Sequence, residues 1–574
     1  MVMVLSAATL LTLTGVLSWT STNMQLSARN NEYYRTVSAA ESATEKVIAA
    51  MEYDYQTSGD LPVRNNVASY KLKVPTAAEN SLWSDYLFSD GQGNGSRTWV
   101  EYIPPTEFRV LAAQYRGLYG YASVFRVISN ARDTTSRFNI TGGVWLDVET
   151  ATIPLFQFAI FYNLDLEINP GPVMTVTGPV HSNQKIYLQP GNVLTFQDDV
   201  TSAGDIINNK KPGDPLVRSG GSIVFEGGHD GGISTLNLPI GTNNSTAAVR
   251  QVVEKPPVGE LPGSPMGLQR YYNKADLIVT VSSVGAVTVT SGLVNNFATA
   301  IPQREWDPIL DFTSFYNKRE AKTVNAVEVN VANLRAYNAM TGTNNSLKAV
   351  LPSANGGDVT LIYVLDNRTQ SASTQAGVRV VNGERLPDHG LTVATPAPMY
   401  VKGNYNITDA TGTSSGASTL HTKPASLIGD AITILSTAWS DANASAALSS
   451  RLASSTTVNA AILAGVVETT TNQYSGGVEN FPRFLEDWNG DTLTYNGSMV
   501  VMYPSQVALG LWQGTGSTIG IYNPPVRSWA FDMNFRDPAK LPPGTPSVRV
   551  LIRGAWAMVR PGTTDIVNPN ELLP

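Results

Sequence analysis

The beginning of the chain carries an uninterrupted apolar pattern. The stretch MVMVLSAATLLTLTGVLSW is almost entirely apolar, and no charged residue precedes Arg29. Because a helix crosses a bilayer with about 20 apolar residues, this stretch is long enough to span one. Its serines and threonines can donate to the carbonyls of the preceding turn, so they do not oppose insertion into lipid. The pattern therefore predicts a membrane-spanning helix.

A second pattern follows directly. Apolar side chains recur at steps of three and four residues, with charged residues around them, which is typical of an amphipathic helix. No proline occurs before Pro62, so one helix of roughly 55 residues and about 80 Å can include both patterns. We expect lipid or neighbouring helices to contact Met1, Val4, Leu5, Ala8, Leu11, Leu13, Val16, Leu17 and Trp19. We expect the body of the protein to contact Leu26, Tyr33, Val37, Ala40, Val47 and Met51.

The remainder of the chain is divided into short segments by Gly, Pro and Asn. Runs of alternating or apolar residues at 97–103, 107–116, 121–131 and 142–150 predict strands. From Met174 on, short apolar runs with small-residue bends suit the stacked coils of a β-solenoid, although a β-sandwich has similar strands. The apolar run IPLFQFAIFYNLDLEI predicts a buried segment rather than a second membrane span. We expect an α+β fold that is mainly β.

These patterns predict four regions. Residues 1–57 form the membrane or filament-core helix, and residues 58–165 form a first α/β or β region. Residues 166–470 form the β-rich, solenoid-like region, and residues 471–574 form a C-terminal β region whose last two apolar runs are strands.

Composition narrows the classes of function. The 574 residues carry a net charge of -7 and include no cysteine. The negative charge argues against a non-specific nucleic-acid binder, which needs a basic surface to neutralise phosphates. Without cysteine there are no disulfides, no thiolate metal sites and no cysteine nucleophile. We expect no nucleic-acid partner.

The four histidines do not form a recognisable catalytic or zinc motif. His181, His229, His389 and His421 lack a second His or a Glu at the spacing of a zinc-binding helix. His181 could bind sugar or act as a base, but a bond to the backbone of a turn is the simpler interpretation. Asp388 precedes His389 directly, but neighbours on a strand point in opposite directions, so this pattern does not indicate a catalytic dyad.

Two groups of acidic residues also suggest chemistry. Asp198 and Asp199 could be paired carboxylates of a polysaccharide-cleaving enzyme, but such pairs lie about 5–9.5 Å apart across a substrate, whereas strand neighbours face opposite sides. Asp487, Asn489 and Asp491 resemble the start of a calcium loop, yet Ser498 replaces the acid that should close it. An Asx-rich hairpin turn is the alternative. We predict no catalytic residue, no cofactor and no enzymatic activity, with this loop as the only calcium candidate.

The segment YRTVSAAESATEKVIAAM, after an apolar N-terminal run, resembles the helix of type IV pilins and type II secretion pseudopilins, in particular PilX-type minor pilins. The segments GPVHSN, FYNKREAKTVNAVEVNVANL and GLTVATPAPMYVKGNYN are similar in texture to the C-terminal regions of large PilX-like proteins. Most pilins have Glu at position five, where this chain has Leu5, and the K-type tip pseudopilins also lack it. Family members are made with a basic leader ending in Gly; a chain that starts at Met1 without it resembles the mature form.

The resemblance implies a structural subunit, minor or at the tip, of a type IV pilus-like or type II secretion-like filament. Its partners would be other pilin subunits, the inner membrane before assembly, a prepilin peptidase, an assembly platform and a surface polysaccharide. It would reside in the cytoplasmic membrane with an extracytoplasmic body, and then in a cell-surface filament. The alternatives are a membrane-tethered protein that binds or cleaves polysaccharide, and a tethered binding module of the periplasm.

Overall fold

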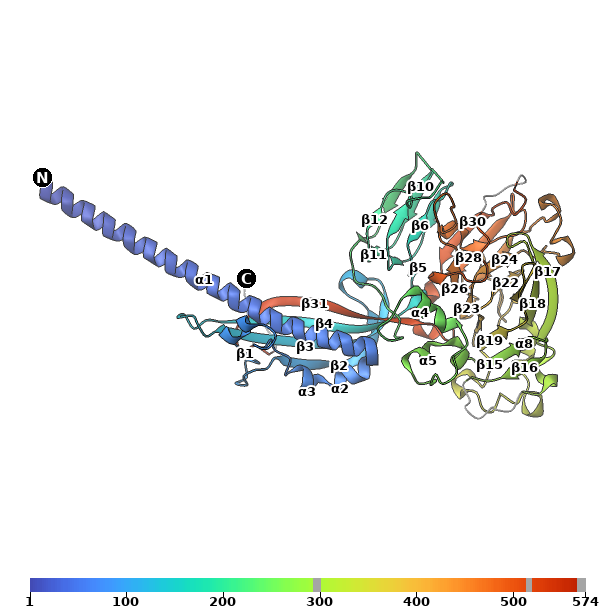
Figure 1. The fold of residues 1–574 in the computed structure, drawn as a ribbon, viewed down its shortest axis with the longest axis horizontal. Helices are drawn as coiled ribbons and strands as arrows, with labels where there is room; N and C mark the ends of the chain where they lie inside the picture. Colours follow the sequence, from blue (N-terminus) through green and yellow to red (C-terminus); the bar gives the residue numbers. More distant parts are fainter. Residues whose placement is uncertain (293–300, 513–518, 565–574) are drawn as a thin grey trace. The chain divides into compact units, whose positions relative to one another are not determined.

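The computed structural model describes residues 1–292, 301–512 and 519–564, and the chain divides into two compact units. The first unit consists of Met1–Arg116, Gly120–Thr152 and the C-terminal residues from Arg549. The second unit consists of Gly117–Tyr119 and Ile153–Val548. The N-terminal helix and most of the last strand therefore belong to the same unit (Figure 1).

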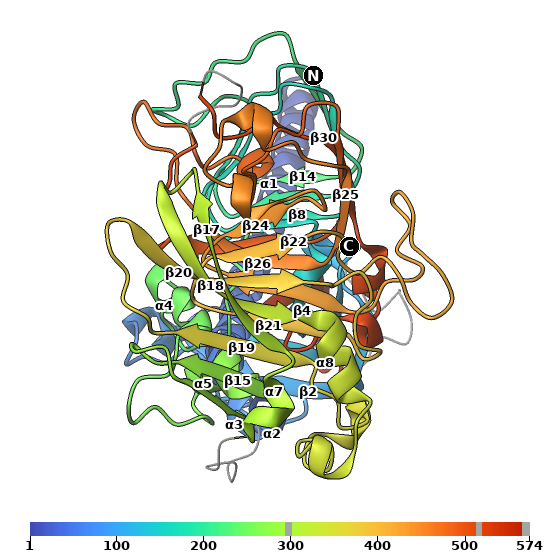
Figure 2. The ribbon, with the colours of Figure 1, turned by 90° about the vertical axis from the view of Figure 1, so that its right-hand side faces the viewer.

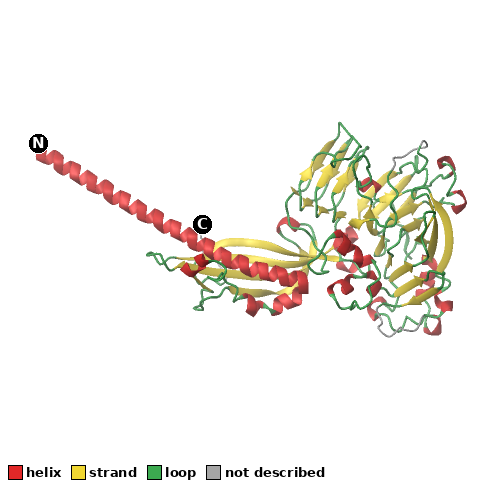
Figure 3. Cartoon of the chain, in the orientation of Figure 1, coloured by secondary structure: helices red, strands yellow, loops and turns green. Residues whose placement is uncertain are grey.

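The N-terminal segment is one helix, α1 (Val2–Ser58), as the sequence predicts. At 1.5 Å per residue it is about 85 Å long. It ends at Gly59, whose φ of 86° is readily available only to glycine and whose N–H bonds to the Tyr55 carbonyl at 3.0 Å. Two short helices, α2 (Asp60–Asn65) and α3 (Val67–Tyr70), follow directly (Figure 3).

The first unit also contains a five-stranded sheet in the order β1-β3-β4-β31, with β2 pairing β3. Its strands are β1 (Tyr86–Ser89), β2 (Trp99–Val110), β3 (Tyr119–Asp133), β4 (Thr141–Pro154) and β31 (Ser547–Val559). The β1–β3 and β3–β4 pairs are antiparallel. The last strand of the chain thus completes the sheet of the N-terminal unit.

Strand β2 differs from the prediction. The sequence suggested separate strands at 97–103 and 107–116, on either side of Pro104 and Pro105. The structure instead has one strand across both prolines. Prolines are tolerated on edge strands, where their missing N–H removes no ladder hydrogen bond, and β2 pairs only with β3.

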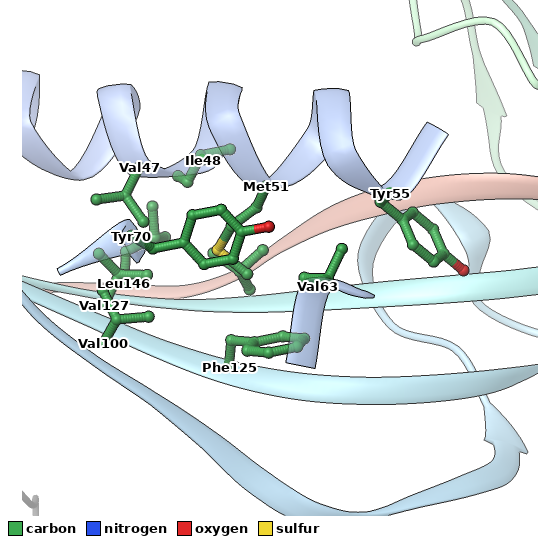
Figure 4. Packing of buried hydrophobic residues seen from close by; sticks show 11 residues of the cluster. Val47, Ile48, Met51, Tyr55, Val63, Tyr70, Val100, Phe125, Val127 and Leu146 are labelled. Atoms are coloured by element: carbon green, nitrogen blue, oxygen red, sulfur yellow. The ribbon is translucent and has the colours of Figure 1, made fainter. Parts of the chain in front are cut away.

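The core of the first unit lies between α1 and this sheet (Figure 4). Residues at helical spacing on α1 pack against alternating residues of β3 and β4, so one helix stripe covers one sheet face. The residues of this cluster are Val47, Ile48, Met51, Tyr55, Val63, Tyr70, Val100, Phe125, Val127, Leu146 and Val148.

The second unit begins with coils of short parallel strands. Ile160, Val180 and Val200 are register partners on successive strands, so the first two coils have 20 residues each, whereas Val200 pairs with His229, 29 residues later. The strands are β5 (Ile160–Tyr162), β6 (Leu166–Ile168), β7 (Met174–Val176), β8 (Val180–Ser182), β9 (Ile186–Leu188), β10 (Val193–Phe196), β11 (Val200–Ser202), β12 (Ile206–Ile207), β13 (Ser222–Phe225) and β14 (His229–Asp230). Strands β5, β8, β11 and β14 pair in one sheet, β6, β9 and β12 in a second, and β7, β10 and β13 in a third.

A second run of strands follows. Its first strands are β15 (Leu277–Val281), β16 (Val287–Thr290), β17 (Leu310–Asn317), β18 (Lys322–Asn330), β19 (Leu361–Asp366), β20 (Thr374–Val381), β21 (Leu391–Ala394) and β22 (Met399–Lys402). The rest are β23 (Ala425–Gly429), β24 (Ile432–Leu435), β25 (Thr456–Asn459), β26 (Ala461–Val466), β27 (Pro482–Arg483), β28 (Thr492–Gly497), β29 (Met499–Pro504) and β30 (Val526–Phe531). Between these strands and before them lie α4 (Thr246–Arg250), α5 (Pro265–Gln269), α6 (Tyr271–Lys274), α7 (Gln303–Trp306) and α8 (Val331–Asn338).

The two runs join in one eleven-stranded sheet, in the order β14-β11-β8-β5-β29-β26-β23-β21-β19-β15-β16. Strand β29, late in the chain, pairs in parallel with β5, where the first run begins. Figure 2 shows several strands of the second run stacked in layers. Pairing is parallel throughout this sheet except between β15 and β16, whereas a β-sandwich is built from antiparallel sheets. The predicted β-rich body is confirmed, and the apolar run at 153–168 lies in its buried first coil.

Candidate functional site: the N-terminal helix

The first half of α1 is exposed along its whole length. Every residue from Met1 to Ser27 is exposed, and the helix extends beyond the sheet of its unit (Figure 1). Leu11 is 74% exposed and Trp19 is 69% exposed. Soluble monomers rarely expose a continuous apolar surface of this kind, because covering it is favourable. The surface requires a partner that the chain itself does not supply.

The residues predicted to contact lipid or neighbouring helices all lie on this exposed half. They are Met1, Val4, Leu5, Ala8, Leu11, Leu13, Val16, Leu17 and Trp19. Within the described ranges, α1 is the one helix long and apolar enough to cross a membrane.

Six hydroxyl groups of this half are bonded within the helix. Thr9 donates to the Leu5 carbonyl at 3.0 Å, and Thr14 donates to the Leu10 carbonyl at 2.7 Å. Ser6, Thr12, Thr20 and Thr22 donate in the same way to carbonyls four residues earlier. The prediction that serines and threonines bond to the preceding turn is confirmed for these six side chains. Because these hydroxyls need no water, they are compatible with lipid or with the apolar interior of a helix bundle.

The second half of α1 is covered by its own unit. Val37 is 5% exposed, and Ala40, Val47 and Met51 are fully buried, while Tyr33 is half-buried. These five residues lie on the covered side of the helix and pack on their own unit.

Leu26 does not join them, because it is 51% exposed. Contact with the body begins at Glu32, whose carboxylate accepts hydrogen bonds from the Ser136 hydroxyl and, at 3.4 Å, from the Ile140 N–H. Both partners lie in the turn between β3 and β4, so the sheet ends there and cannot reach Leu26.

Charged groups fix the helix where it leaves the sheet. Arg35 lies 3.3 Å from the buried carboxylate of Asp133, the last residue of β3. Asp133 also accepts hydrogen bonds from the Thr135 N–H at 2.8 Å and from the Thr135 hydroxyl at 2.6 Å. Burial opposes ionisation, but the Thr135 bonds and the Arg35 charge prevail and lower the pKa of Asp133 below its usual 3.8. This carboxylate is therefore held ionised at the point where exposed helix becomes buried helix.

The last strand also binds α1. Arg549 donates to the carbonyls of Tyr55 and Gln56 at 3.0 and 3.1 Å, and Gln56 donates to the Arg549 carbonyl at 2.9 Å. Arg553 forms an ion pair with Glu45, with 2.6 Å between Nη2 and Oε2. The partners are separated by about five hundred residues of sequence, so no local pattern could have indicated these contacts.

Comparisons with known proteins add little. No family model matches the chain, and no curated protein matches it. Among solved structures, the competence-associated pilin ComZ from Thermus thermophilus aligns over 92% of this chain and 97% of that chain. The sequence identity is 11% and the TM-score is 0.29. A TM-score this low does not establish a common fold.

The candidate histidine His181 is a core residue. It is fully buried in β8, and its ring nitrogens bond to the Thr201 hydroxyl at 2.9 Å and to the Asn183 amide oxygen at 3.0 Å. Burial lowers the pKa of His181 to about 4, so the ring is neutral at pH 7. These bonds support a structural role for His181, although its partners are side chains and not the backbone of a turn, as was expected.

The other three histidines lie apart from one another in different local structures. His229 stacks on Phe225 at 4.4 Å between ring centroids. His389 bonds to Asp358 at 3.0 Å, and His421 bonds to the Thr411 hydroxyl at 2.9 Å.

The two acidic candidates are engaged within the protein. Asp198 forms an ion pair with Arg536 at 3.2 Å, and Asp199 accepts a hydrogen bond from the Gly228 N–H at 2.6 Å. Asp198 and Asp199 therefore bond to different partners within the protein.

The calcium candidate forms an Asx turn. Asp487 accepts hydrogen bonds from the Asn489 N–H at 3.2 Å and from the Asn523 amide at 2.7 Å. Asp491 accepts from the Ser455 hydroxyl at 3.1 Å. Within the described residues, no group of three or more His, Cys, Asp or Glu side chains is placed to hold a metal ion. These bonds correspond to the Asx-rich turn, which was the alternative to a calcium loop.

Proposed function

We propose that this protein is a structural subunit of a pilin-type filament, minor or at the tip, held in the cytoplasmic membrane before assembly and displayed at the cell surface afterwards. The observation that supports this proposal is the division of α1 into an exposed apolar half and a half buried on its own sheet. The β-rich second unit would be the part displayed outward.

The apolar half suits both locations for one physical reason. Lipid tails and neighbouring apolar helices offer the same kind of contact, and hydroxyls bonded within the helix remain satisfied in either. The subunit can therefore move from membrane to filament without exposing new polar groups. Leu5, where most pilins have Glu, supports a minor or tip position by resemblance. A prepilin peptidase and an assembly platform are the processing and assembly partners that this function implies.

The test is a charge at the centre of the apolar half. An arginine at the middle of a membrane helix costs about 2.5–3.5 kcal/mol in insertion experiments. We expect Leu11→Arg to remove most of the protein from the membrane and from filaments, as measured by fractionation and by immunogold labelling of sheared filaments. Gln25→Arg is the matched control, because it adds the same charge close to Arg29, beyond the apolar run.

The outcomes separate the competing functions. A membrane-tethered polysaccharide-binding or polysaccharide-cleaving protein also needs the anchor, so its Leu11→Arg variant would leave the membrane, but its wild type would never appear in filaments. Wild type in the membrane and absent from filaments would therefore reject the filament function. Normal incorporation of Leu11→Arg would reject the role of the helix itself.

A further inference from the structure

The second unit contains a cleft of about 790 Å³ whose lining includes four cations. Arg335 comes from α8, Arg379 from the end of β20, Arg385 from the turn after it, and Lys402 from the end of β22. We call this the basic cleft; Figure 2 labels the helix and the strands that form it. Its volume lies within the range typical of small-ligand sites, about 300–1,000 Å³.

One of the four cations is neutralised within the protein. Arg379 is buried and forms ion pairs with Glu328 at 2.6 Å and with Asp441 at 2.7 Å. Asp441 also accepts a hydrogen bond from the Trp439 ring N–H at 2.8 Å. This group stabilises the wall of the cleft, and because its two carboxylates outnumber its one guanidinium, Arg379 leaves no positive charge for a ligand.

The other three cations have no carboxylate partner among the described residues. Arg335 donates to the backbone carbonyl of Arg385 at 3.1 Å, which leaves its charge uncompensated. The Arg385 Nε is shielded from solvent and has no hydrogen-bond partner in the described structure. Lys402 forms no ion pair there either. Burial opposes ionisation of Asp441, but the hydrogen bonds from Arg379 and Trp439 prevail and lower the pKa of Asp441, and the charge of Lys402 adds to this effect. The exposed Glu384 is the one further acid in the lining, so positive charge prevails.

Unpaired cations in a concave site indicate an anionic ligand. Burying part of a guanidinium without a hydrogen-bond partner is unfavourable, and a carboxylate or sulfate group would satisfy it with short, charge-assisted bonds. The remaining lining is neutral and polar, and includes Asn382, Asn404, Thr408 and Thr437. Amide and hydroxyl groups of this kind match the hydroxyls of a sugar ring.

The same lining argues against nucleic acid. None of the described lining residues is aromatic, and bases of single strands bind largely by stacking on aromatic rings.

We propose that the basic cleft binds an acidic polysaccharide through its carboxylate or sulfate groups. The proposal does not depend on filament assembly, since the cleft lies wholly within the second unit.

The test measures binding by the detergent-solubilised full chain to four probes by titration calorimetry. The probes are oligogalacturonate for carboxylate groups, oligosaccharides of dextran sulfate for sulfate groups, neutral dextran, and duplex DNA. We expect saturable binding to one or both acidic glycans, weakened by salt, and none to neutral dextran.

The decisive variant is Arg385→Gln combined with Lys402→Gln. Neither side chain donates a hydrogen bond within the described structure, so the fold should tolerate their loss. We expect binding of the acidic glycan to weaken at least about tenfold, because each charged hydrogen bond contributes about 1.5–3 kcal/mol. The matched control, Lys255→Gln with Lys318→Gln, removes the same charge outside the cleft and should change binding less than about twofold, as expected for distant charges screened by salt.

Four results would overturn the proposal. They are no saturable binding of either acidic glycan, equal binding of neutral dextran, an equal loss in the control variant, and tighter binding of DNA that the cleft variant abolishes. None of these results bears on filament incorporation, so the two proposals fail independently.

Discussion

The two halves of α1 are covered in different ways. In the second half, Val47 and Met51 are fully buried against the sheet of the same unit. In the first half, Leu11 and Val16 are 74% and 57% exposed, although they are just as apolar. One continuous helix thus has half of its apolar surface covered intramolecularly and half left for another molecule.

The difference shows which half specifies the fold and which half specifies location. The buried half contributes core contacts that the sheet needs for stability, because neither element can bury its apolar face alone. The exposed half contributes nothing to that core, so its sequence is free to match lipid or neighbouring helices. Mutations in the two halves should therefore affect different measurements.

The largest stability difference is expected for one substitution placed in each half. Met51→Ala should destabilise the first unit by about 2–5 kcal/mol, the usual cost of truncating a buried methionine. Met24→Ala, at a residue 69% exposed, should change stability by less than about 0.5 kcal/mol. Hydrogen exchange of β3 and β4 amides in detergent measures both.

Equal effects of the two variants would break the comparison. A large loss in Met24→Ala would mean that the first half also packs on the body, contrary to its exposure. No loss in Met51→Ala would mean that the core between α1 and the sheet relaxes without cost, so that the buried half is not required for the fold.

Local pattern was enough to predict α1 and its division. Two local features of the sequence were sufficient: no proline precedes Pro62, and the apolar residues change from continuous to periodic. The structure has the single helix that these features predict. The boundary of contact was missed at Leu26, because that boundary depends on where the β3–β4 turn ends. Helical spacing carries no information on the length of the sheet that will cover it.

Long-range pairing could not be predicted from the sequence. Strand β31 joins the sheet of the N-terminal unit, and β29 returns to pair with β5, across several hundred residues in both cases. Each strand has an ordinary apolar pattern that would suit many partners. The basic cleft was missed for the same reason, since Arg335, Arg385 and Lys402 are brought together by three separate elements.

A smaller loss of stability is expected for a substitution at Asp133, where the two halves of α1 meet. The folded-state pKa of Asp133 is lowered below the unfolded value of 3.8. The ionised carboxylate therefore contributes to the free energy of unfolding above pH 3.8, and this contribution is lost as the pH falls through the folded-state pKa. We expect Asp133→Asn to cost about 1–3 kcal/mol at pH 7, as for the loss of hydrogen bonds to a buried charge. The difference between wild type and variant should shrink below about pH 4.

Chemical denaturation followed from pH 7 to pH 3 checks this sign. Glu101→Gln, at an exposed residue of β2, is the control and should leave the pH profile unchanged. A difference between wild type and Asp133→Asn that grows as the pH falls would show that Arg35 and Thr135 do not hold this carboxylate ionised.

The smallest effect is expected where the last strand contacts the surface of α1. Glu45 and Arg553 form an ion pair with side chains 40% and 58% exposed, and exposed pairs contribute about 0.2–1 kcal/mol. Glu45→Gln should therefore cost less than about 1 kcal/mol at low ionic strength, and the cost should vanish in about 1 M salt, where the Debye length is near 3 Å. Denaturation curves at both salt concentrations measure it. A salt-independent cost as large as that of Met51→Ala would show that the second half is held by its contacts with β31 rather than by its buried stripe.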